Sequence, residues 1–317
     1  MSDSIVHTID SNGTQEWFLH DAPHRLDGPA VIRADGSQEW FANGWRHRED
    51  GPAVISEDGR CEWWLKGKRH RDGGPAVIYE NGAHEWWSNG VCHREDGPAV
   101  VYPDGTQEWW LAGSRHREGG PAIIGADGRK RWYDSGYPHR LDGPAFIGAD
   151  GSEEWWLAGR RHRDGGPAVI AANGTEYWYR CGLRHRLDGP AVIMADGTQE
   201  WWSVGRNHRI NGPAIIRADG TQEWCVAGSH HRLDGPAIIR ADGTQEWWVG
   251  GRRHRLDGPA FVGADGCCKW YSYSCLHRLD GPAVIKADGT QEWWRDGIRV
   301  EKNSVLDENA TLPPSLC

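Results

Sequence analysis

Residues 28–50 read GPAVIRADGSQEWFANGWRHRED. The apolar run Ala30-Val31-Ile32 is separated from Trp40-Phe41 by a segment that contains Asp35-Gly36, and Asn43-Gly44 follows the aromatic pair. Gly tolerates a positive φ and Asp or Asn tolerates it better than most residues, so the Asp-Gly favours a tight primed turn between two short strands. The second Gly turns the chain back toward the His-Arg pair. Because Pro or Gly recurs every few residues, a helix of even three turns has no room, and the stretch predicts β-hairpins.

The same pattern recurs along the chain with a period of 23 residues. Gly-Pro-Ala begins at Gly28 and returns at every step to Gly281, in twelve copies without insertion or deletion. A Trp keeps the same step from Trp17 to Trp293, and twelve of the 16 histidines fall in one slot, each followed by Arg. A fixed period of this kind indicates a repeat architecture in which each unit shares its hydrophobic face with its neighbours.

The ends of the repeated region differ from its middle. Thirteen units cover residues 5–303; the first lacks Gly-Pro-Ala, and the last has Val300 in the histidine slot. Degenerate ends suit the caps that repeat arrays need. We therefore expect a cap repeat over 1–27 and twelve tandem hairpin repeats over 28–303. A flexible tail over 304–317 is expected because the pattern stops there and Pro313-Pro314 follows.

The predicted fold class is all-β, an elongated β-hairpin repeat array resembling a solenoid, with a twisted antiparallel sheet and two strands per unit. With 21 Trp against four Phe and two Met, the core is expected to consist of tryptophan, each indole closing the seam to the next unit. The residues predicted to form this structural ladder include Trp40, Trp63, Trp86 and Trp109, with His47, His70, Arg48 and Arg71.

Composition argues against several classes of function. The formal net charge of −9 provides no basic field for a nucleic-acid backbone, so no nucleic-acid partner is expected. No apolar run approaches the ~20 residues of a membrane span, and the start has no basic region followed by a hydrophobic stretch. We expect a soluble cytoplasmic protein.

The turn pattern also resembles a known repeat family. Ala42-Asn43-Gly44 through His47 and Gly67-Lys68-Arg69-His70 are similar to the MORN (membrane occupation and recognition nexus) repeat, and the likeness covers residues 5–303. The usual Tyr-x-Gly-x-Trp stretch of that family is replaced here by Gln-Glu-Trp-Trp. The resemblance implies a divergent MORN-like array of hairpins, whereas this replacement leaves lipid contacts unsupported.

The segment His24-Arg25-Leu26-Asp27 contains residue types that could serve as acid, anchor and orienter. Its recurrence argues for structure instead, because an active site is normally made once by unlike residues. On this interpretation Asp caps the turn and His bonds a turn carbonyl, while Arg pairs with a strand Glu such as Glu39 or lies on a Trp face. We therefore expect no enzyme activity, no catalytic residue and no cofactor.

Metal ligands are too sparse along the ladder to share one ion between neighbouring units. One local cluster, Cys267, Cys268, Cys275 and His277, fits no strong zinc spacing, and no metal is predicted, although the sequence leaves that cluster open. The other cysteines occupy unrelated slots, which indicates reduced thiols in a cytosol rather than a disulfide ladder. They are Cys61, Cys92, Cys181, Cys225 and Cys317.

A regular scaffold with a varied face suits a non-enzymatic protein-interaction function. The slot after the Val-Ile pair varies from Arg33 to Lys286 and is expected to face outward. Three repeats depart furthest from Glu-Trp-Trp and supply the predicted partner contacts: Arg131, Tyr133, Tyr177, Tyr179, Arg180, Lys269 and Tyr271. Drift within a scaffold explains such variation equally well. The protein partner is not identified by the sequence, and self-association through an end or edge strand is a further expectation.

The alternative function is a module for carbohydrate or choline-type head groups. It would use the second aromatic slot, occupied for example by Trp110, as a binding site between repeats. Cys225 stands in the same slot, which indicates partial burial rather than the wall of an aromatic cage.

Overall fold

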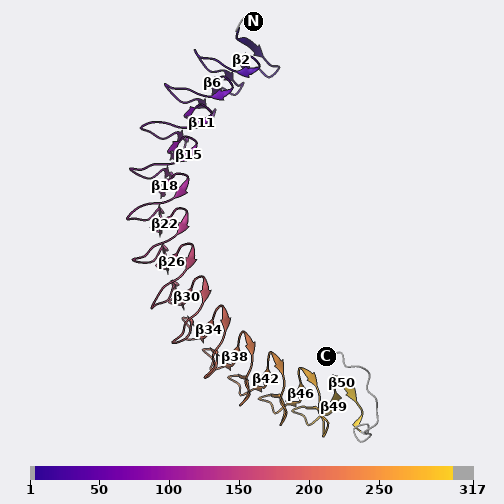
Figure 1. Cartoon of the computed structure of the whole chain (residues 1–317). Coiled ribbons are helices and arrows are strands. Elements are labelled where there is room, and N and C mark those ends of the chain that lie inside the picture. The colour runs from indigo at the N-terminus through magenta and orange to yellow at the C-terminus, as the bar shows by residue number, and fades with distance from the viewer. Residues whose placement is uncertain (1–3, 303–317) are drawn as a thin grey trace. The chain divides into compact units, whose positions relative to one another are not determined.

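The computed structural model describes residues 4–302, and its regular elements in that range are all β-strands (Figure 1). This confirms the predicted all-β array of antiparallel hairpins. The chain divides into two units, Met1–Arg160 and Arg161–Cys317, and each is described by itself. The predicted tail over 304–317 lies outside the described residues. Within the described part of the chain, no helix has the length and apolar character that a membrane crossing requires.

One repeat contains two hairpins. In residues 28–50, β4 (Val31–Ile32) pairs with β5 (Gln38–Glu39), and β6 (Phe41–Ala42) pairs with β7 (Trp45–Arg46). The sequence predicted two strands per unit, whereas the structure has four strands of two residues in this repeat. The second strand is split at Trp40 because its N–H bonds Ala53 O of the next repeat while its carbonyl accepts from His47 N.

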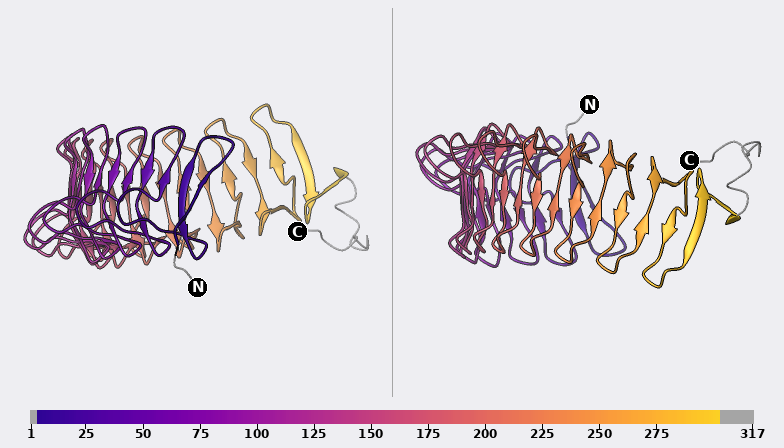
Figure 2. Two further views of the ribbon diagram at one scale, coloured as in Figure 1. Left: turned by 90° about the horizontal axis from the view of Figure 1, so that it is seen from above. Right: turned by 90° about the horizontal axis from the view of Figure 1, so that it is seen from below.

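The first hairpins of successive repeats join into an antiparallel sheet, because β5 also pairs with β8 of the next repeat. Figure 2 shows these strands side by side within each unit. In the first unit the strands of this sheet are β1 (Val6–Ile9), β2 (Gln15–Leu19), β4, β5, β8 (Val54–Ile55), β9 (Cys61–Glu62), β12 (Val77–Ile78), β13 (His84–Glu85), β16 (Val100–Val101), β17 (Gln107–Glu108), β20 (Ile123–Ile124), β21 (Lys130–Arg131), β24 (Phe146–Ile147) and β25 (Glu153–Glu154). In the second they are β28 (Val169–Ile170), β29 (Glu176–Tyr177), β32 (Val192–Ile193), β33 (Gln199–Glu200), β36 (Ile215–Ile216), β37 (Gln222–Glu223), β40 (Ile238–Ile239), β41 (Gln245–Glu246), β44 (Phe261–Val262), β45 (Cys268–Lys269), β48 (Val284–Ile285) and β49 (Gln291–Arg295).

A second hairpin follows each sheet strand pair, and most of these hairpins are separate two-stranded ribbons; in the first and last repeats β3 (Ala22–Pro23) and β50 (Ile298–Val300) instead pair with the long strands β2 and β49 of the sheet. Besides β6 and β7, their strands are β3 (Ala22–Pro23), β10 (Trp64–Leu65), β11 (Lys68–Arg69), β14 (Trp87–Ser88), β15 (Val91–Cys92), β18 (Trp110–Leu111), β19 (Ser114–Arg115), β22 (Tyr133–Asp134), β23 (Tyr137–Pro138), β26 (Trp156–Leu157), β27 (Arg160–Arg161), β30 (Tyr179–Arg180), β31 (Leu183–Arg184), β34 (Trp202–Ser203), β35 (Arg206–Asn207), β38 (Cys225–Val226), β39 (Ser229–His230), β42 (Trp248–Val249), β43 (Arg252–Arg253), β46 (Tyr271–Ser272), β47 (Cys275–Leu276) and β50 (Ile298–Val300).

The primed turn lies in the second hairpin, whereas the sequence predicted it at Asp35-Gly36. Asn43 and Gly44 have φ of 50° and 79°, as a two-residue type I′ turn requires. At the other turn, Gly36 N–H bonds Arg33 O and only Gly36 has a positive φ, so the loop is a longer turn that ends on a left-handed glycine. Asp35 Oδ1 accepts the N–H of Ser37 at 2.8 Å and stabilises this loop.

The buried core consists of alanine, β-branched residues and glutamate, so the expectation of a tryptophan core is wrong. Ala30 has no exposed surface, and the same slot is fully buried at every Gly-Pro-Ala from Ala53 to Ala283. The Trp residues of the ladder, such as Trp40, are only half-buried. Large indoles stay at the margin because the inner face of the sheet is occupied by Val31 and Glu39, which lie opposite each other across β4 and β5.

Candidate functional site

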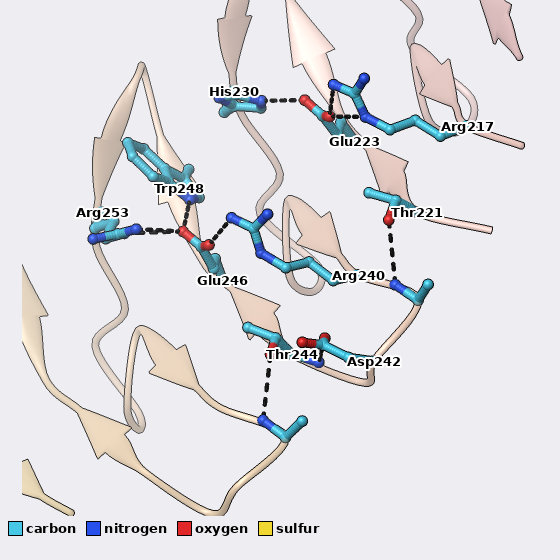
Figure 3. A network of polar contacts seen from close by, with 12 residues as sticks. Arg217, Thr221, Glu223, His230, Arg240, Asp242, Thr244, Glu246, Trp248 and Arg253 are labelled. Carbon is cyan, nitrogen blue, oxygen red and sulfur yellow. Dashed lines mark hydrogen bonds and ion pairs between the residues drawn. The ribbon is translucent and has the colours of Figure 1, made fainter. Parts of the chain in front are cut away.

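Glutamate occupies one slot on the inner face of the sheet in ten of the thirteen repeats, and five of these glutamates are buried. Glu39 is 5% exposed, Glu62 3% and Glu246 1%. Buried carboxylates need cations and hydrogen bonds to compensate for lost hydration. Glu39 receives Arg33 Nη2 at 2.6 Å and Arg46 Nη2 at 2.7 Å, and Glu246 is held by Arg240 and Arg253 in the same way (Figure 3).

These contacts keep the carboxylates charged. Burial alone would raise the pKa of Glu246, but hydrogen bonds from Arg240 and Arg253 hold it below the ordinary value. At Glu223 the hydrogen bond with His230, 2.8 Å away, is the largest influence on the pKa. Together with Arg217 it outweighs burial and lowers the pKa to about 2. Figure 3 shows the two carboxylates with their partners in successive repeats.

The second aromatic slot belongs to the same network. Trp64 Nε1 donates to Glu62 at 2.9 Å, and the equivalent bond from Trp248 to Glu246 measures 3.1 Å. Two guanidinium groups, those of Arg46 and Arg69, lie 5.4 and 5.3 Å from the centre of the Trp64 ring. Cys225, in the same slot, is 4% exposed, which confirms the partial burial expected of this position.

The predicted partner contacts fall where this network changes. Arg131, Tyr177 and Lys269 occupy the glutamate slot, and the aromatic residue two positions later is Tyr at each of them, namely Tyr133, Tyr179 and Tyr271. A Trp N–H in this slot needs a carboxylate acceptor, whereas a Tyr ring does not. Arg131 and Lys269 lie instead against Phe146 and Phe261, at 5.3 and 5.2 Å from the ring centres.

Contacts within the protein thus account for the departures from Glu-Trp-Trp in these three repeats. Tyr179 Oη accepts a hydrogen bond from Arg184 Nε at 3.3 Å, and Arg184 also lies 5.3 Å from the Tyr177 ring. Arg131 and Arg180 are exposed, whereas Lys269 is half-buried. The seven residues are not gathered into one site, since they belong to three separated repeats. Their role in partner binding stays a prediction.

The slot after the Val-Ile pair was expected to face outward, and this is wrong for several repeats. In these repeats the side chain reaches back to the glutamate of the inner face: Tyr79 Oη donates to Glu85 at 3.0 Å and Lys286 lies 2.9 Å from Glu292. Gly125 in this slot is buried.

The histidine ladder links neighbouring repeats through an acceptor atom. Asn43 N–H donates to Nδ1 of His24 at 2.9 Å, and Gly250 N–H donates to Nδ1 of His231 at 3.1 Å. The predicted bond from His to a turn carbonyl is therefore wrong. A neutral Nδ1 holds the first residue of the type I′ turn in the next repeat, whose N–H would otherwise lack a partner within the hairpin.

Each arginine of the His-Arg pair lies on the Trp of its own repeat, which confirms one of the two predicted arrangements. Arg48 is 4.2 Å from the Trp40 ring centre and donates from Nε to Asp50 at 2.9 Å. A Cβ on Gly51 would lie 2.9 Å from the guanidinium carbon, so the close contact requires glycine. The Asp pairs with this Arg and does not cap the turn by itself.

The loops between repeats present their tips to solvent, and the residue after His-Arg is the tip. In five consecutive repeats of the second unit this residue is aliphatic and 61–91% exposed. We call these residues the aliphatic tip row: Leu187 (84%), Ile210 (81%), Leu233 (80%), Leu256 (91%) and Leu279 (61%). An exposed Leu is ordinary by itself, but here exposed aliphatic side chains recur in the same slot of five consecutive repeats.

The same slot in the first unit is acidic over four consecutive repeats. This acidic tip row consists of Glu49, Asp72, Glu95 and Glu118, and all four are exposed. The two rows occupy equivalent loops of one repeat pattern, so folding does not require an aliphatic side chain at the tip.

In the first unit, clefts lie between successive tips. The cleft between the loops of Leu26 and Glu49 has a volume of about 710 Å³ and includes Trp40 and Ala42 in its lining. In the second unit the corresponding slots hold Leu233 and Leu256 as tips, with Trp247 and Val249 between them.

A strained residue lies beside this row. Val204 is the first residue of a type I′ turn, with φ of 47°, and is 64% exposed. A β-branched residue is unfavourable in the left-handed region, and such strain is commonest at functional positions. Val204 N–H donates to Nδ1 of His185, two residues before the tip Leu187, and thereby places another apolar side chain near the row.

The cysteine cluster is not assembled. Cys268 lies in β45 and Cys275 in β47, which belong to different hairpins, and among residues 4–302 no group of three or more potential ligands is placed to hold a metal ion. Cys275 is disulfide-bonded. Cys61, Cys92, Cys181 and Cys225, for which reduced thiols were expected, are free cysteines. Burial raises the pKa of Cys92 to about 12 and that of Cys225 to about 11, so both thiols stay protonated at neutral pH.

Comparison with known proteins gives little further guidance. No protein-family model and no curated protein matches the chain. Among solved structures, the chain is similar to the TCP10 domain of Danio rerio CPAP in complex with a peptide of Danio rerio STIL. The identity is 12%, the coverage 86% of this chain and 91% of that chain, and the TM-score 0.14. The G-box domain of the microcephaly protein CPAP is similar at 13% identity over 77% of this chain and 97% of that chain, with a TM-score of 0.13. At such scores neither likeness carries a conclusion about function.

Proposed function

We propose that the protein is a non-enzymatic scaffold that binds a protein partner through the aliphatic tip row. The observation that carries this proposal is the exposure of 61–91% at five aliphatic tips in consecutive repeats. Burying one such side chain in an interface contributes about 1.5–3 kcal/mol before the costs of association. A regular series of them gives a partner several equivalent anchors.

Other features support the same proposal. The conspicuous polar groups recur in most repeats and are engaged with one another: His with the next turn, Arg with Trp, and Glu with Arg. They are thus committed to holding the array together. The proposal keeps the protein MORN-like in its repeat pattern and cytoplasmic, as the sequence leads us to expect.

The alternative head-group module has no observation in its favour. Its binding site would use the second aromatic slot, where Trp64 already donates to Glu62 and lies between 5.3 and 5.4 Å from two guanidinium groups. A sugar or a quaternary ammonium group would have to displace these contacts.

Affinity capture with quantitative mass spectrometry tests the proposal. The test variant carries Leu187→Glu, Leu233→Glu and Leu256→Glu, which copy residues of the acidic tip row. A control variant carries Gln199→Glu, Gln222→Glu and Gln245→Glu, which add the same charge to the sheet of the same unit. The proposal expects a protein that is captured by the wild type and the control and lost from the test variant. Equal capture by all three would contradict it.

A further inference from the structure

We infer that the partner segment that occupies the aliphatic tip row is a basic amphipathic α-helix with an apolar residue at every seventh position. This inference rests on the proposed function and names the partner's chemistry. It follows from the spacing of the tips, from the charge beside each tip and from the clefts between tips.

The spacing follows from the sheet. Each repeat contributes two strands to it, such as β40 and β41, and strands lie about 4.8 Å apart, so successive tips advance by roughly 10 Å. Seven residues of an α-helix advance by about 10.5 Å. Apolar side chains one heptad apart on one helix face therefore meet successive tips, and four heptads cover the row.

The charge beside the tips is negative. Leu187, Leu233, Leu256 and Leu279 are each followed by an aspartate, and those carboxylates are 82–84% exposed although an Arg Nε donates to one oxygen of each. Four of the five tips therefore pair an apolar side chain with an acidic one, whereas Ile210 is followed by Asn211. A complementary partner presents a Lys or Arg beside every apolar residue.

This alternation favours a helix over an extended partner. On an α-helix, residues i and i+4 share a face, so one apolar and one basic side chain per heptad point toward the same surface. A polyproline helix also advances by about 9 Å per turn, but it has three residues per turn and directs only one of them to a given side. A second copy of this chain would bring one acidic row against another, which is unfavourable.

The clefts provide room for the helix side chains. An equivalent cleft between tips in the first unit measures about 710 Å³ and has Trp40 in its lining. In the second unit Trp247 and Val249 occupy the corresponding slots between Leu233 and Leu256. Apolar side chains of the helix can enter between tips while its basic side chains reach the aspartates.

A synthetic peptide tests the inference. The probe is a four-heptad helix with Leu at every seventh position and Lys four residues after each Leu, carrying a fluorescent label for anisotropy. Two control peptides have the same length: one replaces Lys with Glu, and one moves the Leu residues so that they no longer share a face. A third peptide places Leu at every third position of a proline-rich chain.

The inference expects saturable binding of the probe to the full chain with a Kd below ~100 µM, and at least ~10-fold weaker binding by both helical controls. The triple Leu→Glu tip variant should lose binding by a similar factor. The reciprocal variant in the acidic tip row, Glu49→Leu, Asp72→Leu and Glu95→Leu, should gain a second site. Circular dichroism and the urea midpoint confirm that both variants fold.

Three results would overturn the inference. They are equal binding of the probe by the wild type and the tip variant, no saturation up to ~1 mM, and tighter binding of the proline-rich peptide. A fourth result would come from sedimentation of the chain alone. If the wild type forms a dimer that the tip variant does not form, the occupant of the row is a second copy of the chain. If capture of a natural protein still depends on the tips while the probe fails, the scaffold function stands and only the helix is wrong.

Discussion

Trp248 Nε1 lies 3.1 Å from Oε2 of Glu246, and the carboxylate it bonds is the most deeply buried charge of the row, with 1% of its side chain exposed. The pair explains why the second aromatic slot changes together with the glutamate slot. In the next repeat Lys269 stands in the slot of Glu246, and Tyr271 stands in the slot of Trp248. The slots of Arg253 and Arg240 hold Leu276 and Gly263 there. In that repeat a cation in the glutamate slot thus goes together with the loss of both arginines that would face it.

Glu246→Lys alone is expected to destabilise the array by about 3 kcal/mol, because it places a cation beside Arg240 and Arg253 and leaves Trp248 without its acceptor. Adding Arg240→Gly, Trp248→Tyr and Arg253→Leu, which reproduces the Lys269 repeat, should recover at least half of the loss. Urea denaturation followed by circular dichroism measures both. A compensated variant as unstable as the single one would show that the slots are not coupled.

Stability should fall in acid as Glu223 becomes protonated. Its folded pKa of about 2 lies below the ordinary 4.5, so its contribution of about 3 kcal/mol is present above pH 4.5 and is lost as the pH falls toward 2. Urea midpoints between pH 5 and pH 2 measure this. The variant Glu223→Gln should flatten that part of the profile, and an unchanged slope in the variant would rule out Glu223 as the source.

Removing one histidine acceptor should open one turn. His231→Leu leaves the N–H of Gly250 without its acceptor at 3.1 Å, at a local cost of about 1–2 kcal/mol. Amide hydrogen exchange at Gly250 is therefore expected to accelerate by roughly tenfold or more. The N–H of Ala227, which bonds His208 at 3.2 Å, is the internal control and should not change. Equal acceleration at both amides would indicate general unfolding instead.

Val204→Asn should stabilise the protein by about 1 kcal/mol, because Asn tolerates the φ of 47° that strains a β-branched residue. The side chain is 64% exposed, so little packing is lost. Ser274→Gly, at a second non-glycine turn position with φ of 77°, provides a matched comparison. Thermal unfolding of both variants gives the measurement. A loss of stability on Val204→Asn would mean that Val204 packs more tightly than its exposure indicates.

The sequence predicts the period, the hairpins and the all-β character of residues 4–302, and it gives the Arg-on-Trp contact as one of two alternatives, because these depend on turns and on neighbours within one repeat. It does not reveal the buried glutamates, because Glu is ordinarily exposed and only the approach of Arg33 and Arg46 from two other slots makes its burial tolerable. A signal was available: each residue that replaces Glu is followed two positions later by Tyr. The split of the strand at Trp40 could not be predicted, since it depends on a carbonyl of the next repeat.

At the tips, too, the sequence does not reveal which side chains are exposed. Leu233 and Glu95 stand in one slot, and the sequence alone does not say whether that slot is inside or outside. The structure shows that both are exposed, at 80% for Leu233 and 83% for the Glu95 side chain. Only the structure identifies the aliphatic series in the second unit as a row of exposed side chains.

Amide hydrogen exchange of the full chain with and without its captured partner tests the central claim most directly. The account predicts protection of the loops that carry Leu187, Ile210, Leu233 and Leu256, and no change in the loops that carry Glu49, Asp72 and Glu95. Protection of the acidic loops in their place, or binding that leaves the aliphatic loops unprotected, would contradict it.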